Sequence, residues 1–472
     1  MAWAPRPAGN SLDAAVDAGK ALRSRASRRD QGDWQPRPDR PDPIDVLKQS
    51  DAGRLADLLP IRYGRMLESP FTFYRGAAAI MASDLAPLNV SGIRTQICGD
   101  SHLLNFGGFG TAEGRFVFDV NDFDETTLGA WEWDLKRLAT SIVIAGQHLH
   151  LQASDVRAAT LRCARAYREW IREYAAMPVL DVWYARLDER RLAAIVRSAE
   201  ERRQYAASIK KAKSQSRAHV YPRVASKCGA DAKLVDEPPL LYHPPDTAPF
   251  LAMVRQTFDA YCETLPEDRR ALFHRFHFLD AAYKVVGVGS VGTRCLIALF
   301  VAADDDALVL QMKEARASVF ETYAGAPSYR SEGNRVVTGQ RALQAASDLF
   351  LGFATADDGH DYYIRQLRDM KTSPDVDHMS SVALADYADF CGWALARAHS
   401  KASGCAGMIS GYLGRSSAFD EAMLSFAQAY AKQNERDYEA LVEAVRAGKI
   451  TVASTNGSSA SNEPASAAVR TP

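Results

Sequence analysis

A short apolar stretch of the chain, CGDSHLLNFGGFG at 98–110, contains three polar side chains whose types suit metal-assisted group transfer. Asp100, His102 and Asn105 lie within six residues of one another. In phosphoryl transfer one carboxylate orients the attacking hydroxyl, while an amide oxygen and a second carboxylate hold Mg²⁺ against the nucleotide phosphates. The plainer alternative is a polar turn in which the Asp and Asn side chains cap the backbone.

Further carboxylates follow in the next predicted strand. The segment RFVFDVNDFDE, residues 115–125, starts with alternating apolar residues and ends in acids, which predicts a strand running into a loop. Its aspartates are Asp119, Asp122 and Asp124. Hard oxygen ligands of this kind suit Mg²⁺ better than zinc. The sequence leaves open which of the three binds metal.

A glycine-rich segment downstream forms the second group. Gly287, Gly289 and Gly292 make a GxGxxG pattern that encloses Ser290. A dinucleotide-binding fold needs a helix after such a turn, but TRCLIALFV follows and reads as a strand. We therefore expect a hairpin whose glycines cover nucleotide phosphates, with a ligand-free glycine-kinked hairpin as the alternative.

Lys313 completes this second group. It lies in LVLQMKEA, 313 − 287 = 26 residues after the first glycine, in the strand expected to follow the hairpin. A Lys in that position can reach the α- and β-phosphates. An exposed strand Lys is the alternative explanation.

The first group has a counterpart in known enzymes. Gly99 to Asn105, GDSHLLN, resembles the GDxHxxN catalytic loop of aminoglycoside and choline phosphotransferases, which are distant relatives of protein kinases. The resemblance implies that Asp100 orients the acceptor hydroxyl and that Asn105 binds metal. His102 joins Asp100 in the expected catalytic set, either by touching the acceptor or phosphate or by shaping the loop.

The same resemblance extends to NDFD at 121–124. It implies that Asp122 binds metal with Asp124 assisting, and that Asp134 braces the catalytic loop from below. The gap between Asn105 and Asp122 is longer than usual in kinase-like enzymes, so Asp119 remains a rival metal ligand.

An acid should position Lys313 by the same analogy. Glu332 has suitable spacing, 332 − 313 = 19 residues later, and is our expected partner. Gln340 and Glu314 are its rivals, and a loop Glu without this role is the alternative.

The order of the two groups differs from that of kinases. The glycine hairpin and Lys313 follow the catalytic loop here, whereas they precede it in kinases. We therefore expect an α+β, two-lobed, kinase-like fold in circularly permuted order, which is feasible because a closed core does not depend on where the chain is cut. The expected parts are a disordered arm (1–42), a catalytic lobe (43–275), a β-rich nucleotide lobe (276–375), returning helices (376–450) and a disordered tail (451–472).

A closer resemblance spans most of the chain. Segments such as LLPIRYGRMLESPFTFYRGAA, FDVNDFDET, WEWDLKRLATS and RVVTGQRALQAASDLFLG are similar to an uncharacterised bacterial family, domain-of-unknown-function family 2252. That family implies no substrate.

The function expected from these groups is ATP- and Mg²⁺-dependent phosphoryl transfer to an unidentified hydroxyl acceptor, more readily a small molecule than a protein. There are three alternatives: AMP transfer from the same site, a non-catalytic nucleotide-binding protein, and a metal-dependent phosphohydrolase that uses Asp100, His102 and the three downstream aspartates.

The arginines in apolar surroundings are expected to pair mostly with buried carboxylates, and binding of an anionic acceptor is the other choice. They are Arg62, Arg65, Arg75, Arg365 and Arg368.

The composition of the chain limits its possible partners, its disulfide and zinc content and its location. A net charge of −1 gives no global argument for a nucleic-acid partner. Seven scattered cysteines without a CxxC pair argue against a disulfide framework and a structural zinc site. The chain shows no secretory signal and no apolar run of membrane-spanning length, so we expect a cytoplasmic protein without a membrane partner. The oligomeric state cannot be predicted.

Overall fold

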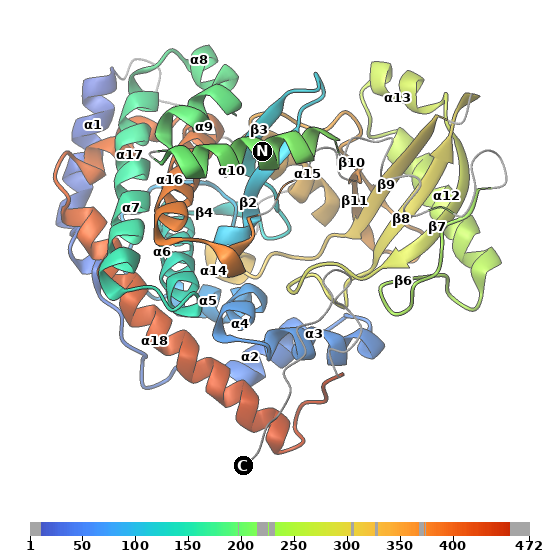
Figure 1. Cartoon of the computed structure of the whole chain (residues 1–472), viewed down its shortest axis with the longest axis horizontal. Coiled ribbons are helices and arrows are strands. Elements are labelled where there is room, and N and C mark those ends of the chain that lie inside the picture. The colour runs from blue at the N-terminus through green and yellow to red at the C-terminus, as the bar shows by residue number, and fades with distance from the viewer. Residues whose placement is uncertain are drawn as a thin grey trace.

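The computed structural model describes residues 11–196, 198–214, 225, 232–303, 306–325, 329–367, 372 and 374–453. Helices dominate one side of the molecule and a large antiparallel sheet dominates the other (Figure 1). This segregation of helices and sheet confirms the α+β class.

The large sheet has six strands in the order β10-β11-β9-β8-β7-β6. The strands are β6 (Leu241–Tyr242), β7 (His277–Lys284), β8 (Cys295–Val301), β9 (Ala307–Glu314), β10 (Gly352–Thr355) and β11 (Asp361–Gln366). Adjacent strands all run antiparallel, and Lys313 of β9 lies opposite Tyr363 of β11 and Cys295 of β8. The expected hairpin is therefore present: β7 and β8 flank the glycine segment, and β9, which carries Lys313, pairs with β8.

Helix α12 (Thr247–Cys262) covers the sheet together with α13 (Glu267–Phe273). Phe250, Val254 and Phe258 of α12 belong to one hydrophobic cluster with Leu296 and Phe300 of β8. The β-rich part therefore begins before residue 276, where we had placed its boundary.

The helical part is built around α6 (Trp131–His148), which is buried over most of its length. It packs with α7 (Ala153–Ala176), α16 (Ser381–Ser403) and α18 (Ala418–Arg446). Further helices are α8 (Val179–Tyr184), α9 (Glu189–Ile195), α10 (Ala199–Ser214) and α17 (Ala406–Leu413).

Two small sheets carry the polar motifs at the border of the helical part. One pairs β1 (Arg94–Ile97) with β4 (Thr127–Ala130), and the other contains β2 (Phe106–Gly110), β3 (Phe116–Val120) and β5 (Leu187–Asp188). The predicted strand at 115–125 is thus β3 followed by a loop. Helices α14 (Glu321–Ala324) and α15 (Glu332–Leu343) connect this border with the large sheet.

The N-terminal region carries several short helices. They are α1 (Leu12–Ala21), α2 (Pro43–Ser50), α3 (Leu59–Met66), α4 (Pro70–Gly76) and α5 (Ala78–Leu85). Helices α2, α3 and α4 lie below the gap between the helical part and the large sheet in Figure 1.

The expected disordered arm at 1–42 is wrong for the residues described. Helix α1 packs along α17 because Gly19 and Gly411 let the two backbones approach closely: a Cβ at Gly19 would lie 1.9 Å from the Met408 carbonyl oxygen. Arg23 and Arg28 then donate to the Tyr412 and Leu413 carbonyls. The segment has few large apolar residues, which misled the prediction, but small residues supply the contact between the two helices. Of the predicted disordered tail, residues 454–472 lie outside the described residues.

Among the described residues, no helix has both the length and the apolar character needed to cross a membrane.

Candidate active site

Two adjoining cavities lie between the helical part and the large sheet. The helix-side cavity measures about 370 Å³ and the sheet-side cavity about 450 Å³. Five residues line both cavities and define what we call the junction: Arg75, Asn105, Asp122, Gly287 and Ser290. The two groups of polar and glycine residues, far apart in the sequence, therefore meet at one place.

The loop that carries Asp100 is fixed from below by Asp134 of α6. The backbone N–H groups of Cys98 and Gly99 donate to the two Asp134 carboxylate oxygens at 2.7 and 2.9 Å. His399 of α16 lies 3.1 Å from the same carboxylate. Gly99 adopts φ +81°, and a Cβ there would meet the Glu125 carbonyl oxygen at 2.3 Å. The bracing role expected for Asp134 is confirmed, and His399 is a second brace that the sequence did not reveal.

Asp100 is held by a partner that the sequence analysis missed. Arg137 Nε donates to Asp100 Oδ1 at 2.5 Å, and the Arg137 side chain is fully buried. Arg137 Nη2 also donates to the Tyr74 carbonyl at 2.9 Å. One oxygen of Asp100 is thereby fixed, while the residue still lines the helix-side cavity. A basic residue in the second turn of an apolar helix was the available signal.

His102 is buried beside Asp100, and its Nε2 lies 3.8 Å from Asp100 Oδ2. Burial lowers the pKa of His102 to about 3, against the opposing charge of Asp100, so the imidazole is neutral. His102 lines the helix-side cavity, where a neutral ring can hydrogen-bond but supplies no positive charge.

Asn105 closes the short 3₁₀ turn Leu103–Asn105 that follows the loop. Its amide nitrogen donates to the Asp100 carbonyl at 2.6 Å, which leaves the amide oxygen to act as an acceptor. Its own carbonyl accepts from the Asn121 N–H at 2.8 Å. This bond ties the turn that follows Asp100 to the loop that carries Asp122.

Asp122 and Asp124 occupy different surroundings. Asp124 accepts from Lys313 Nζ at 2.6 Å, from Tyr363 at 2.6 Å and from Ser290 at 3.1 Å. Burial alone would raise the pKa of Asp124, but the charge and hydrogen bond of Lys313 outweigh it and lower that pKa to about 2. Its oxygens therefore already have protein partners.

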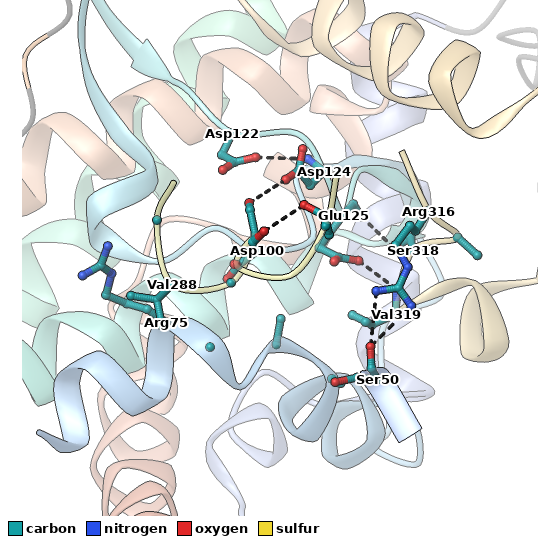
Figure 2. A pocket seen from close by; sticks show the side chains of 18 of the residues that line it. Ser50, Arg75, Asp100, Asp122, Asp124, Glu125, Val288, Arg316, Ser318 and Val319 are labelled. Atoms are coloured by element: carbon teal, nitrogen blue, oxygen red, sulfur yellow. Dashed lines mark hydrogen bonds between the residues drawn. The ribbon is translucent and has the colours of Figure 1, made fainter. Parts of the chain in front are cut away.

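Asp122 lines the junction, and the contact found for its carboxylate is the Asp124 N–H at 3.2 Å. Burial and the charge of Asp124 raise the pKa of Asp122. Figure 2 shows Asp122 and Asp124 above Asp100 in the cavity. A carboxylate whose charge is disfavoured, lining the same junction as Asn105, fits a divalent cation.

The structure does not support Asp119 as a metal ligand. Its side chain is fully buried and accepts from Arg397 Nη2 at 2.8 and 2.9 Å and from the Ala345 N–H at 2.7 Å. It lines neither cavity. Within the described ranges no group of three or more His, Cys, Asp or Glu residues is arranged to hold a metal by itself.

The glycine loop connects β7 and β8, as a hairpin should. Gly287 and Gly292 adopt φ +66° and +90°, the left-handed region that glycine tolerates. Arg65 donates to the Gly287 carbonyl, Arg54 to the Val291 carbonyl at 2.7 Å, and the Leu55 N–H to the Gly292 carbonyl at 2.7 Å. The segment around α3 thus anchors the loop over the junction.

Lys313 lines the sheet-side cavity and pairs with Asp124, not with the expected Glu332. Burial opposes its charge, but Asp124 and Tyr363 hold the pKa of Lys313 well above its usual value. Glu332 pairs instead with Arg335 at 2.6 Å. The assignment of Glu332 as the partner of Lys313 is therefore wrong, because the Glu332 carboxylate pairs with Arg335, one turn further along α15.

Helix α15 nevertheless reaches the site through Arg335. This buried side chain donates to the Asp124 carbonyl at 3.0 Å and to the Thr126 carbonyl at 2.6 Å. The contact fixes the loop that carries Asp122. An arginine inside a helix gave no sequence signal for this role.

The five arginines that the sequence places in apolar surroundings have separate roles. Arg62 contacts Asp51 at 3.5 Å and donates to the Gly76 carbonyl, as expected of a structural pair. Arg365 donates to the Asn121 carbonyl at 3.3 Å, and Arg65 holds the glycine loop. Among the described residues Arg75 has no such partner, and Arg368 lies outside the described residues.

A family model described as an uncharacterized protein conserved in bacteria, DUF2252, matches residues 54–444. The chain belongs to this family. No curated protein and no solved structure matches it. The matched range contains the whole junction as well as Asp100, Lys313 and Asp134, whereas α1 and α2 precede it.

Proposed function

We propose that this member of the DUF2252 family is an ATP- and Mg²⁺-dependent phosphotransferase with a circularly permuted kinase-like arrangement. The observation that carries the proposal is the junction itself. Asn105 and Asp122 line both cavities together with Gly287 and Ser290, although the two pairs are far apart in the chain. Two unrelated polar motifs would have no reason to line one common cleft.

The sheet-side cavity has the size and lining expected of a nucleotide site. Its volume of about 450 Å³ falls in the range of small-molecule pockets. Leu104, Val286 and Leu367 supply apolar surface, and Lys313 supplies a positive charge. The nucleoside would lie there, with its phosphates directed toward the glycine loop and the junction.

Asn105 and Asp122 are the residues that would hold Mg²⁺, and the remaining ligands would be phosphate oxygens and water. When bound, the ion would neutralise charge on the phosphates. Asp124 assists indirectly, because it holds Lys313 and Ser290 in place.

The acceptor would enter the helix-side cavity, where Asp100 lies. Arg137 engages Asp100 Oδ1, so Oδ2 is the oxygen that would receive the acceptor proton. In phosphoryl transfer the enzyme mainly positions the reactants and stabilises charge, which is what this rigidly braced loop supplies.

Label transfer tests the proposal. The protein is incubated with Mg²⁺ and ATP labelled at either the α- or the γ-phosphate, together with a panel of hydroxyl compounds that includes sugars, amino alcohols and aminoglycosides. We expect γ-label in a product made by the wild type and a loss of at least about 100-fold in Asp100→Asn. Full γ-transfer by that variant would contradict the assignment of Asp100. Transfer of α-label would indicate AMP transfer, and ATP binding without any product would indicate a binding protein.

A metal-dependent phosphohydrolase has less support than phosphoryl transfer. It would use Asp119, which is buried with Arg397, and it gives no role to the glycine loop or Lys313. Hydrolysis of a generic phosphoester without ATP would favour it.

A further inference from the structure

Arg75 is the only basic residue among the five that line the junction. Its Nε is buried without a hydrogen-bond partner. Within the part of the chain that the structure describes, no hydrogen bond or ion pair reaches its guanidinium. The side chain is therefore a cation at the meeting point of the two cavities with no counter-charge in contact.

The other arginines of the helix-side cavity are engaged by the protein. Arg54 donates to the Val291 carbonyl, Arg62 to the Gly76 carbonyl, and Arg316 to the Ser50 carbonyl. The positions of these three arginines are explained by the hydrogen bonds that they donate to the backbone. Among the described residues no such bond explains the position of Arg75.

The backbone around Arg75 is fixed on both sides. The Tyr74 carbonyl accepts from Arg137 at 2.9 Å, and the Gly76 carbonyl accepts from Arg62 at 3.0 Å. Arg137 is also the residue that binds Asp100, so one side chain sets the distance between Asp100 and the end of α4. The Arg75 carbonyl in turn lies 3.4 Å from the position of a Cβ on Gly289, against the glycine loop. A rigid backbone that carries an unpaired cation is the arrangement of a preorganised anion site.

Arg75 is half-buried, so its unpaired charge is only partly solvated. This burial lowers the pKa of Arg75, and the charge of Asp100 only partly offsets the effect. A structural role would normally include a bound carboxylate or carbonyl. Figure 2 shows Arg75 at one end of the helix-side cavity and Arg316 at the other, with Asp100 between them. An anion bound at the junction would neutralise the positive charge of Arg75.

We infer that Arg75 contacts the phosphoryl group as it passes from the nucleotide to the acceptor, which makes it a catalytic residue of the reaction proposed above; the inference rests on that proposed function. Lys313 lines only the sheet-side cavity, so it suits the phosphates that remain on the leaving nucleotide. Arg75 faces both cavities and suits the group that moves between them.

In this step the acceptor oxygen forms a bond to the γ-phosphorus and loses its proton to Asp100. The bond between the γ-phosphorus and the bridging oxygen breaks, and its electron pair stays on ADP. The guanidinium binds the equatorial oxygens of the transferred group, where charge is spread in the transition state.

Nucleotide titrations test the inference with Arg75→Met, Arg75→Lys and the surface control Arg157→Met, whose arginine is half exposed and pairs with Glu421. Each is titrated with Mg²⁺-ATP, Mg²⁺-ADP and pyrophosphate. We expect Arg75→Met to weaken ATP binding about tenfold while ADP binding stays within about twofold. Arg75→Lys should recover part of the loss, because Lys keeps the charge but not the planar fork. Thermal unfolding of each variant shows whether it is folded.

The outcomes separate the two claims. An unchanged ratio of ATP to ADP affinity in folded Arg75→Met overturns the role of Arg75 and leaves the phosphotransferase proposal standing. The wild type could instead bind pyrophosphate in an Arg75-dependent manner but bind no ATP. That result would support an anion site at Arg75 and overturn the phosphotransferase proposal. If the wild type binds none of the three, both claims fail.

Discussion

Lys313 Nζ lies 2.6 Å from the Asp124 carboxylate, although 189 residues separate the two in the chain. This pair joins the large sheet to the loop that follows β3. It therefore links the two halves of the proposed cleft, and it makes Lys313 part of the fold as well as of the site.

Removing Lys313 should leave Asp124 as a charge without its main partner. We expect Lys313→Met to lower the free energy of unfolding by about 2–3 kcal/mol, less than for a fully buried pair because the Asp124 side chain keeps 28% exposure. Lys313→Met combined with Asp124→Asn should lose less than the sum of the single changes. Urea unfolding of the four proteins measures this coupling, and strict additivity would show that the pair contributes nothing.

Asp119 should behave as a structural residue. Asp119→Asn leaves the buried Arg397 without its counter-charge, and we expect a loss of about 3–5 kcal/mol of stability with Mg²⁺ absent. A metal ligand would respond differently, because its removal in metal-free buffer relieves repulsion. Wild-type stability of Asp119→Asn in EDTA would argue against the pairing described for this residue.

The neutral state of His102 predicts a specific pH dependence. Its pKa is about 3 in the folded protein and near 6.5 when unfolded, so the unfolded chain takes up a proton between these values. The stability contributed by neutral His102 is complete above pH 6.5 and falls by at most about 1.4 kcal/mol per pH unit as the pH drops toward 3.

His102→Gln cannot take up this proton, so its urea midpoint should decline less than that of the wild type between pH 6.5 and 4. His378, which is 82% exposed, offers a matched control through His378→Gln. Parallel declines in wild type and His102→Gln would show that His102 titrates normally in the folded protein.

Docking of α1 depends on the absence of a side chain at Gly19. Gly19→Ala would normally favour a helix by about 1 kcal/mol, but its Cβ would overlap the Met408 carbonyl. We therefore expect net destabilisation of about 1–3 kcal/mol and faster proteolysis between residues 12 and 42. Ala18→Ser, at an exposed position of the same helix, is the control. Stabilisation by Gly19→Ala would mean that α1 does not pack this closely.

Local sequence patterns singled out residues that line the two cavities but did not give their partners. Asp100, Asn105 and Asp122 all line the helix-side cavity, and the strand-forming residues after Gly292 form β8. The partners of Lys313 and Asp100 are not local. Asp124 and Arg137 are their partners because the packing of strands and helices brings these residues together. Spacing along the chain does not encode that packing.

The same limit applies to the fold. The packing of Phe258 on Phe300 shows that α12 belongs to the sheet, and this contact between distant residues is not encoded by spacing along the chain. Helix α1 was missed because hydrophobic content, the usual signal for a packed helix, is replaced there by glycine contacts with α17.

Mg²⁺-dependent ATP binding tests the central claim most directly. Isothermal titration of ATP into the wild type and into Asp122→Asn, each with Mg²⁺ and with EDTA, separates nucleotide from metal. We predict that Mg²⁺ strengthens ATP binding to the wild type and that Asp122→Asn loses most of this gain while remaining folded. Absence of ATP binding by the wild type, or an equal Mg²⁺ effect in both proteins, would contradict a Mg²⁺-nucleotide site at the junction.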